Sequence, residues 1–598
     1  VNDLITTANS GTITLNGAGN TFALAVSFLD TDTVTLGTSA FNGGVTFTAA
    51  TPIVLRGAIT TSGPVDFLAG GVTLTANSSV ATTIGNPVGG AIAFGAGITD
   101  GAGTFNLALD AGTGGAVTVA TTTAINNLTL TSATSNTFTG NVTVNDLITT
   151  ANSGTITLNG AANTFAAQVD FLNTGLVTLG NGGDSSTFDN GVTFSANAAS
   201  NFGGAIVTSG DVANFGTGGV TLGSDSTVDT TNAGGSAAGA NIAFGAGIAG
   251  AFDLGLTAGT GAVTVATTTN ITDLTLTSAT SNTFTGNVTV NDLITTANSG
   301  TITLNGAANT FVAAVDFLNT ATVLGNGAGD ISTFNGGVAS TGNGTYNVQG
   351  TVRSSADALH FGTGVMTLAG DTSIDATNAG GSAGGGNINF GSLTGAFDLA
   401  VNAGTGGAIA VNTTTNITDL TLTRATGTTF TGNVTVNDLI TTANSGTITL
   451  NGAANTFVAA VDFLNTGLVT LGDAGTDSST FAGGVAFGGN AASALQGAFV
   501  TTNTNANFGT GGVTLGADTT ITTGAGAGDI AFGAGITDGA GTFNLGLTAG
   551  AGAVTVATTT AINNLTLTSA TSNTFTGNVT VNDLITTANS GTITLNGA

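Results

Sequence analysis

The sequence predicts an all-β fold, a right-handed parallel β-solenoid built from tandem repeats of about 145 residues. Three observations predict this fold class. An 18-residue phrase recurs at a nearly constant spacing, short segments alternate apolar residues with threonine, and Gly, Asn and Asp separate these segments. Because each turn of a solenoid contacts only its neighbours, such a fold accommodates 598 residues without the size limit of a single core.

Long repeats define the organisation of the chain. The phrase VNDLITTANSGTITLNGA begins at spacings of 143, 146, 146 and 145 residues, at Val1, Val144, Val290, Val436 and Val581. The chain therefore divides into four solenoid repeats and the start of a fifth, at residues 1–143, 144–289, 290–435, 436–580 and 581–598. Since residues 1–18 and 581–598 are the same part of the repeat, we expect the chain to be a segment of a longer array.

The strands follow from a shorter pattern inside each repeat. Segments such as Thr12–Leu15, Val72–Leu74 and Leu128–Leu130 alternate apolar residues and Thr, which is typical of a half-buried strand. We expect strands of about 4–6 residues, turns of about 20–24 residues and about 25–30 turns in all, with the right-handed crossover of parallel strands. A propeller array is the alternative. Its blades would contain characteristic Trp or His and Asp residues about every 40–50 residues, whereas this sequence has no Trp and one His.

The loops between the strands are rich in Asn and Gly. Asn16, Asn159 and Asn305 follow the strand segment of the repeated phrase in three of its copies. Asn side chains at equivalent places of stacked strands form amide ladders. We therefore expect these three residues to take part in such ladders.

Composition excludes several classes of function. All 31 acidic residues are Asp, and the only basic residues besides His360 are Arg56, Arg353 and Arg424, for a net charge of −28. Binding of nucleic acid needs many more cations than this. The near absence of Glu, Lys and Gln argues against a helix-rich fold, and no apolar run is long enough to predict a membrane-spanning helix.

Calcium is the one ligand for which the loops provide candidates. Loops 180–184, 325–330 and 473–477 combine Gly with Asp, and their carboxylates are Asp184, Asp330, Asp473 and Asp477. Repeated calcium-binding loops occur on successive turns, whereas these occur once per long repeat, and Ca²⁺ needs 6–8 oxygen ligands. We predict no resident cofactor, keep Ca²⁺ as an open alternative, and favour diffuse screening of the negative charge as the role of cations.

The aspartates of the repeated phrase are not predicted to pair with one another. At about 4.8 Å per turn, equivalent positions of successive repeats lie about 30 Å apart, which exceeds the Debye length of about 8 Å. We interpret them as turn or cap residues, at Asp3, Asp146, Asp292, Asp438 and Asp583.

One segment gathers the rare residue types, Tyr346, Arg353, His360 and Met366. Alignment of the repeats argues against a catalytic role, because the position of His360 is filled in the other repeats by Asp66, Asn214 and Asn507. We expect an exposed polar site beside a turn. Carbohydrate-cleaving enzymes need paired carboxylates in a cleft; the sequence predicts no enzyme and no catalytic residue. Ranks of Thr, as at Thr12 and Thr14, raise ice binding as a further hypothesis, although alternation in strands explains them.

The Gly/Thr/Asn-rich repeat, written NVTVNDLITTANSGTITLNGA in its fullest form, resembles the β-solenoid shafts of bacterial surface and secreted adhesins of the filamentous-haemagglutinin-like and autotransporter-like groups. The resemblance spans the whole chain. It implies a secreted structural filament at the cell surface or outside the cell, with a role in adhesion or in forming a matrix or coat. Its implied partners are further copies of itself, end to end or side by side, and cell-surface glycans or the surfaces of host or neighbouring cells. A glycan-binding adhesin module and a calcium-stabilised surface-layer-like protein are the alternatives.

Overall fold

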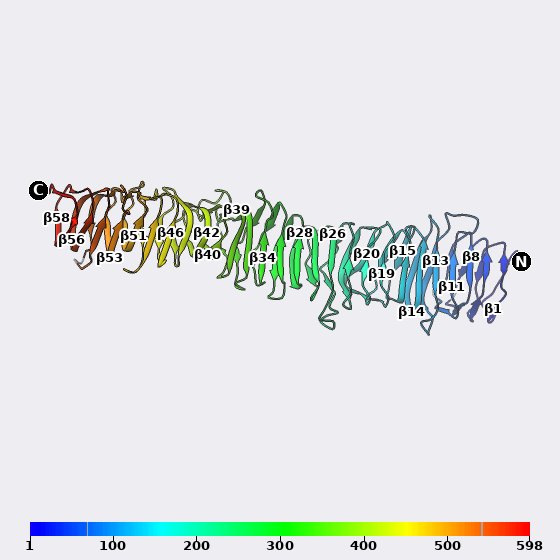
Figure 1. Cartoon of the computed structure of the whole chain (residues 1–598). Helices are drawn as coiled ribbons and strands as arrows, with labels where there is room; N and C mark the ends of the chain where they lie inside the picture. Colours follow the sequence, from blue (N-terminus) through cyan, green and yellow to red (C-terminus); the bar gives the residue numbers. More distant parts are fainter. Residues whose placement is uncertain (49, 69, 540–541, 598) are drawn as a thin grey trace. The chain divides into compact units, whose positions relative to one another are not determined.

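The fold is a parallel β-solenoid with turns of about 21 residues. A computed structural model describes residues 1–48, 50–68, 70–539 and 542–597, so Ala598, the last residue of the predicted fifth segment, lies outside the described residues. The chain divides into two units, Val1–Thr301 and Ile302–Ala598, each of which is built from such turns (Figure 1). The units contain about 28 turns in all, which confirms the expected number and length of turns.

The strands of residues 142–278 illustrate how a unit is built. Each strand pairs in parallel with strands of the neighbouring turns, so that Ile156, Val177, Ser200 and Val220 follow one another in register. The strands are β16(Val142–Thr149), β17(Thr155–Leu158), β18(Ala162–Phe165), β19(Val169–Asp170), β20(Val177–Phe188), β21(Val192–Thr193), β22(Ser200–Thr208), β23(Ala213–Asn214), β24(Val220–Leu222), β25(Ser226–Asp229), β26(Ile242–Ala249), β27(Leu254–Thr257) and β28(Ala262–Ser278).

Strand lengths differ from the expected 4–6 residues. They range from two residues in β19 to 17 in β28. The longest strands run around a corner of the turn without a break, because one residue in the left-handed region redirects the chain. This residue is not Gly; in β14(Ala116–Ser132), β28, β42(Ile409–Arg424) and β56(Ala553–Ser569) it is Ala124, Asn270, Asn416 and Ala561, with φ of 56°, 57°, 62° and 59°.

Phenylalanine rings form columns in the interior. Alternation along each strand directs one set of side chains inward, as in β17, where Ile156 and Leu158 are fully buried. In unit 1, the rings of Phe171, Phe194, Phe215 and Phe244 follow one another with centroid separations of 4.8, 5.5 and 4.7 Å. Unit 2 repeats this column with Phe463, Phe487, Phe508 and Phe532 at 5.0, 5.4 and 4.7 Å. Contacts between aromatic rings add stability beyond that of the apolar area they bury. The columns therefore stabilise the packing of successive turns.

Candidate functional site

Three of the four predicted calcium ligands, Asp184, Asp330 and Asp477, use their carboxylates to close their own loops. The carboxylate of Asp184 accepts a hydrogen bond from the amide of Asn181 at 3.0 Å. Asp330 accepts from the amides of Asn326 and Gly327 at 2.8 and 2.9 Å. These carboxylates therefore satisfy backbone donors that the tight loop would otherwise leave unpaired.

The third loop is closed in the same way. Asp477 accepts from the amides of Asp473 and Ala474 at 2.8 and 2.9 Å, while the side chain of Asp473 is exposed. Of the predicted ligands, the structure brings only Asp473 and Asp477 together in one loop. Across the described ranges, no group of three or more His, Cys, Asp or Glu side chains is arranged to hold a metal ion.

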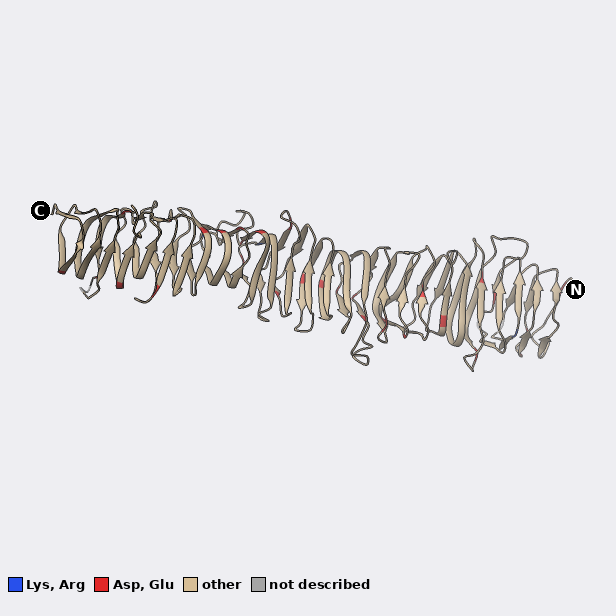
Figure 2. Cartoon of the chain, in the orientation of Figure 1, with Lys and Arg blue, Asp and Glu red and all other residues tan. Residues whose placement is uncertain are grey.

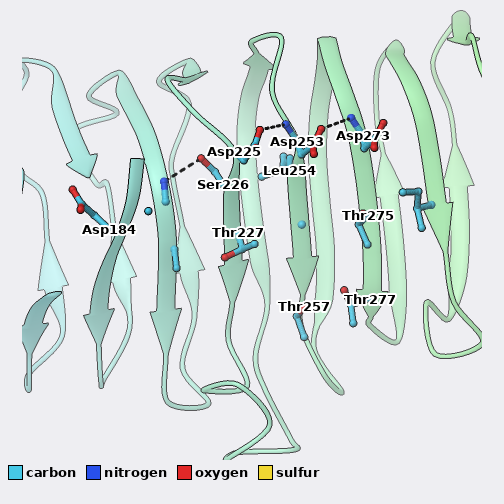
Figure 3. A pocket seen from close by; sticks show the side chains of 15 residues that line it. Asp184, Asp225, Ser226, Thr227, Asp253, Leu254, Thr257, Asp273, Thr275 and Thr277 are labelled. Carbon is cyan, nitrogen blue, oxygen red and sulfur yellow. Dashed lines mark hydrogen bonds between the residues drawn. The ribbon is translucent and has the colours of Figure 1, made fainter. Parts of the chain in front are cut away.

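A column of aspartates that the sequence did not lead us to expect runs across four successive turns of unit 1. We call Asp225, Asp253, Asp273 and Asp292 ladder 1. The amide of Asp253 donates to the carboxylate of Asp225 at 3.1 Å, and the amide of Asp273 donates to that of Asp253 at 3.2 Å (Figure 3). Asp273 is in turn the register partner of Asp292. Asp292 belongs to the repeated phrase. Its acidic neighbour is Asp273 of the preceding turn, and not the aspartate of another copy of the phrase.

Unit 2 contains a second column of the same kind, which we call ladder 2: Asp371, Asp398, Asp419 and Asp438. The amide of Asp398 donates to the carboxylate of Asp371 at 3.3 Å. Asp419 is the register partner of Asp438, as Asp273 is of Asp292. Aspartates occur along both units (Figure 2), but these ladders place four carboxylates on consecutive turns, where neighbouring strands are about 4.8 Å apart.

A shallow groove of about 610 Å³ runs beside ladder 1. Asp225, Asp253 and Asp273 form one rim, and threonines line the area below it (Figure 3). Asp184 also lines this groove. Between Asp184 and Asp225 the intervening turn contributes Gly204, which pairs with Asp184 and has a φ of 129°. A Cβ at Gly204 would lie 2.2 Å from the carbonyl oxygen of Asp184, so this part of the groove can be formed only by glycine.

The pKa is raised at the last aspartate of each ladder. Burial, and then the charge of Asp273, raises the pKa of Asp292. In ladder 2, burial and then Asp419 raise the pKa of Asp438. Both effects disfavour the charged form, so these carboxyl groups keep their protons to higher pH than an isolated aspartic acid.

The segment with the rare residues does not form a site. Tyr346 in β37(Thr345–Ser354) and Met366 in β39(Val365–Asp375) are register partners and are buried in the core. Arg353 is half-buried on the outer side, and its Nε donates to the Thr333 hydroxyl at 3.0 Å. His360 is the second residue of β38(Leu359–His360) and follows a fully buried leucine. The expected exposure was therefore wrong, because His360 is half-buried. Its place at the end of a two-residue strand, just before the bend at residues 363–364, agrees with the expected position beside a turn.

The fold and the grooves define the class of protein, a parallel β-solenoid with acidic ladders on its outer face. Beyond that class, no protein-family model, no curated protein and no solved structure matches this chain. Among the described residues, no helix is long and apolar enough to cross a membrane.

Proposed function

We propose that this chain is the shaft of an extracellular or cell-surface fibre with an adhesive or coat-forming role, secreted by a bacterium. The observation that carries the proposal is the stacking itself: about 28 turns joined by parallel backbone ladders and by columns of phenylalanine rings. Such a stack derives stiffness from every turn, and its length follows from the number of turns. Each repeat of about 145 residues is then a unit of six or seven right-handed turns.

The electrostatics support assembly end to end rather than side by side. Ladders 1 and 2 concentrate like charges on the outer faces of their units, and the chain has only three basic residues to offset a charge of −28. Like charges on facing surfaces oppose lateral contact of two copies. The strand edges of a terminal turn offer free backbone groups to a further turn, which favours growth along the stacking direction.

Electron microscopy of the purified chain is expected to show slender rods. About 28 turns at about 4.8 Å per turn give a length of about 130 Å, with an axial repeat of about 30 Å for each long repeat. Adding one further copy of a 145-residue repeat should lengthen the rod by about that axial repeat, because turns add in series. Globular particles, or rods whose length does not depend on the number of repeats, would contradict a shaft.

A further inference from the structure

One aspartate occupies a buried position that is asparagine in the other repeats. Asp30 is fully buried, and it corresponds to Asn173, Asn319 and Asn465. At Asn173, the side-chain amide donates to the carbonyl oxygens of Gly154 and Gly175 at 2.9 and 2.8 Å. The amide therefore fills a small polar slot between two turns.

The fourth repeat uses asparagine in the same way. The amide of Asn465 donates to the carbonyl oxygens of Gly446 and Gly467, both at 2.9 Å. Two acceptors that face one slot need donors or a positive charge between them. In these repeats the asparagine NH₂ group supplies the donors.

Two backbone features are shared by the loops of Asp30 and Asn173. The amide of Leu29 donates to the hydroxyl of Thr6 at 2.7 Å, and the equivalent bond from Leu172 to Thr149 is also 2.7 Å. Gly11, which corresponds to Gly154, has the same φ of 67°. Gly11 and Asp32 stand at the sequence positions of the two glycines whose carbonyl groups accept from the Asn173 amide.

Aspartate cannot replace the donors that the amide supplies. Neither carboxylate oxygen of Asp30 has a hydrogen-bond partner among the described residues, and the side chain is 0% exposed. Burial, and to a lesser degree the charge of Asp32, raises the pKa of Asp30. Asp32 itself is exposed and stands where the second repeat has Gly175. This loop therefore combines a buried unpaired carboxylate, a second carboxylate at the solvent side and two backbone carbonyl groups.

We propose that Asp30 and Asp32, together with the carbonyl oxygens of Gly11 and Asp32, bind one calcium ion in the place that the asparagine amide fills in the second and fourth repeats. The ligands are all oxygen, two carboxylates balance a divalent charge, and an irregular loop suits the flexible coordination of Ca²⁺ better than the strict octahedron of Mg²⁺. Water can complete the coordination shell on the exposed side of Asp32. This site differs from the loops of Asp184, Asp330 and Asp477, whose carboxylates already accept backbone amides.

Hydrogen exchange measured by mass spectrometry tests the site, because the chain contains its own reference. With CaCl₂ in place of EDTA at constant ionic strength, the amides of residues 26–36 are expected to exchange at least tenfold more slowly. Residues 169–179, which form the same loop with asparagine, should not change. MgCl₂ at the same concentration controls for screening of the overall negative charge.

Two variants decide the assignment. Asp30→Asn restores the side-chain amide of the other repeats. In this variant the backbone amides of residues 26–36 should exchange slowly without calcium, and calcium should have no further effect. A Cβ at Gly175 would lie 2.5 Å from the carbonyl oxygen of Gly154, so the transfer is made in the third repeat, which has Asn319 and Ala321 at these positions. The double variant Asn319→Asp/Ala321→Asp should transfer the response to residues 315–325. Asp357→Asn removes one exposed charge in unit 2 and should leave the response unchanged.

The following outcomes would overturn the proposal. The first outcome is a calcium response that is equal at residues 26–36 and 169–179, or that persists in the Asp30→Asn variant. Either result would indicate diffuse binding of calcium. The second outcome is that hydrogen exchange of residues 26–36 does not respond to CaCl₂ but slows when the pH is lowered from 7 to 5. This result would show that a proton, and not a metal ion, fills the slot.

Discussion

Replacing Tyr346 by Ser is expected to destabilise the turns around it strongly, and adding Ser340→Phe is expected to restore most of the loss. In the second and fourth repeats the corresponding pairs are Phe194 with Ser200 and Phe487 with Ser493. The third repeat therefore has its large aromatic residue six positions later. Large and small residues have exchanged places within one part of the core.

The ring geometry explains why this exchange works. Tyr346 lies between Phe317 and Phe361, with centroid separations of 6.0 and 5.3 Å and both contacts edge to face. Tyr346 and Ser340 are both buried, at 2% and 5% exposure. The tyrosine ring thus fills the space that the ring of Phe194 fills between Phe171 and Phe215 in unit 1.

The expected magnitudes follow from core packing. Truncating a buried aromatic side chain costs about 3–5 kcal/mol, and inserting Phe at Ser340 beside an unchanged Tyr346 costs about 1–3 kcal/mol through overpacking. The double variant Ser340→Phe/Tyr346→Ser recreates the pattern of the second repeat, so the two effects should offset each other. Hydrogen exchange of residues 338–361 is the measurement, since turns of a solenoid can open locally.

The reverse exchange, Phe194→Ser/Ser200→Tyr, provides a matched control in unit 1. It should also be tolerated better than either of its single substitutions. If the effects of Ser340→Phe and Tyr346→Ser simply add, the two residues do not compensate for each other.

Removing carboxylates from the ladders is expected to stabilise the protein at neutral pH. The pKa values of Asp292 and Asp438 are raised in the folded state, so the folded protein binds these protons more tightly than the unfolded chain. Their contribution to stability is therefore fully present below the unfolded pKa of about 3.8–3.9 and is lost as the pH rises through the folded pKa. Stability should therefore fall as the pH rises above about 4 at these positions.

The double variant Asp292→Asn/Asp438→Asn tests this effect. Each substitution should stabilise by up to about 1 kcal/mol at pH 7, a value limited by solvent screening because both groups are half-buried. The melting temperature should therefore depend less on pH between 4 and 7 than that of the parent chain. Asp357→Asn, which removes an exposed charge outside the ladders, is the control. A pH profile that the double variant shares with the parent would show that the ladders do not disfavour the charged carboxylates.

The turn length, the parallel pairing and the inward alternation could be predicted from the sequence because they depend on period-two segments alone. The strand lengths could not, since a single left-handed residue such as Ala124 lets one strand continue around a corner. No sequence pattern marks Ala as a corner residue. The backbone conformation of corner residues is therefore harder to predict from the sequence than the alternation of side chains within a strand.

The ladders had a signal in the sequence that was missed. Asp253-Leu254, Asp273-Leu274 and Asp292-Leu293 repeat one dipeptide at the length of a turn, 20 and 19 residues apart. Comparison of whole repeats about 145 residues apart conceals this spacing, because it aligns Asp292 with other copies of its phrase and not with the neighbouring turn.

Amide and carboxylate ladders also lie at other positions than expected. The prediction concerned Asn16, Asn159 and Asn305, which follow a strand. Some side chains that accept an amide from the next turn precede a strand, as Asn77 does for the amide of Asn106 at 3.0 Å. Others end a strand, as Asp170 does, which accepts from the amide of Ser195 at 3.1 Å. Positions before a strand are suited to this bond because the register already brings the next turn's amide beside them.

Labelling of intact cells of the source organism tests the central proposal most directly. Antibodies raised against this chain, detected with gold particles in the electron microscope, should mark thin fibres or a coat outside the cell envelope. Cells in which the gene is deleted should lose both the label and those structures. Label confined to the cell interior, or surface structures that are unchanged after the deletion, would contradict a role as an extracellular shaft.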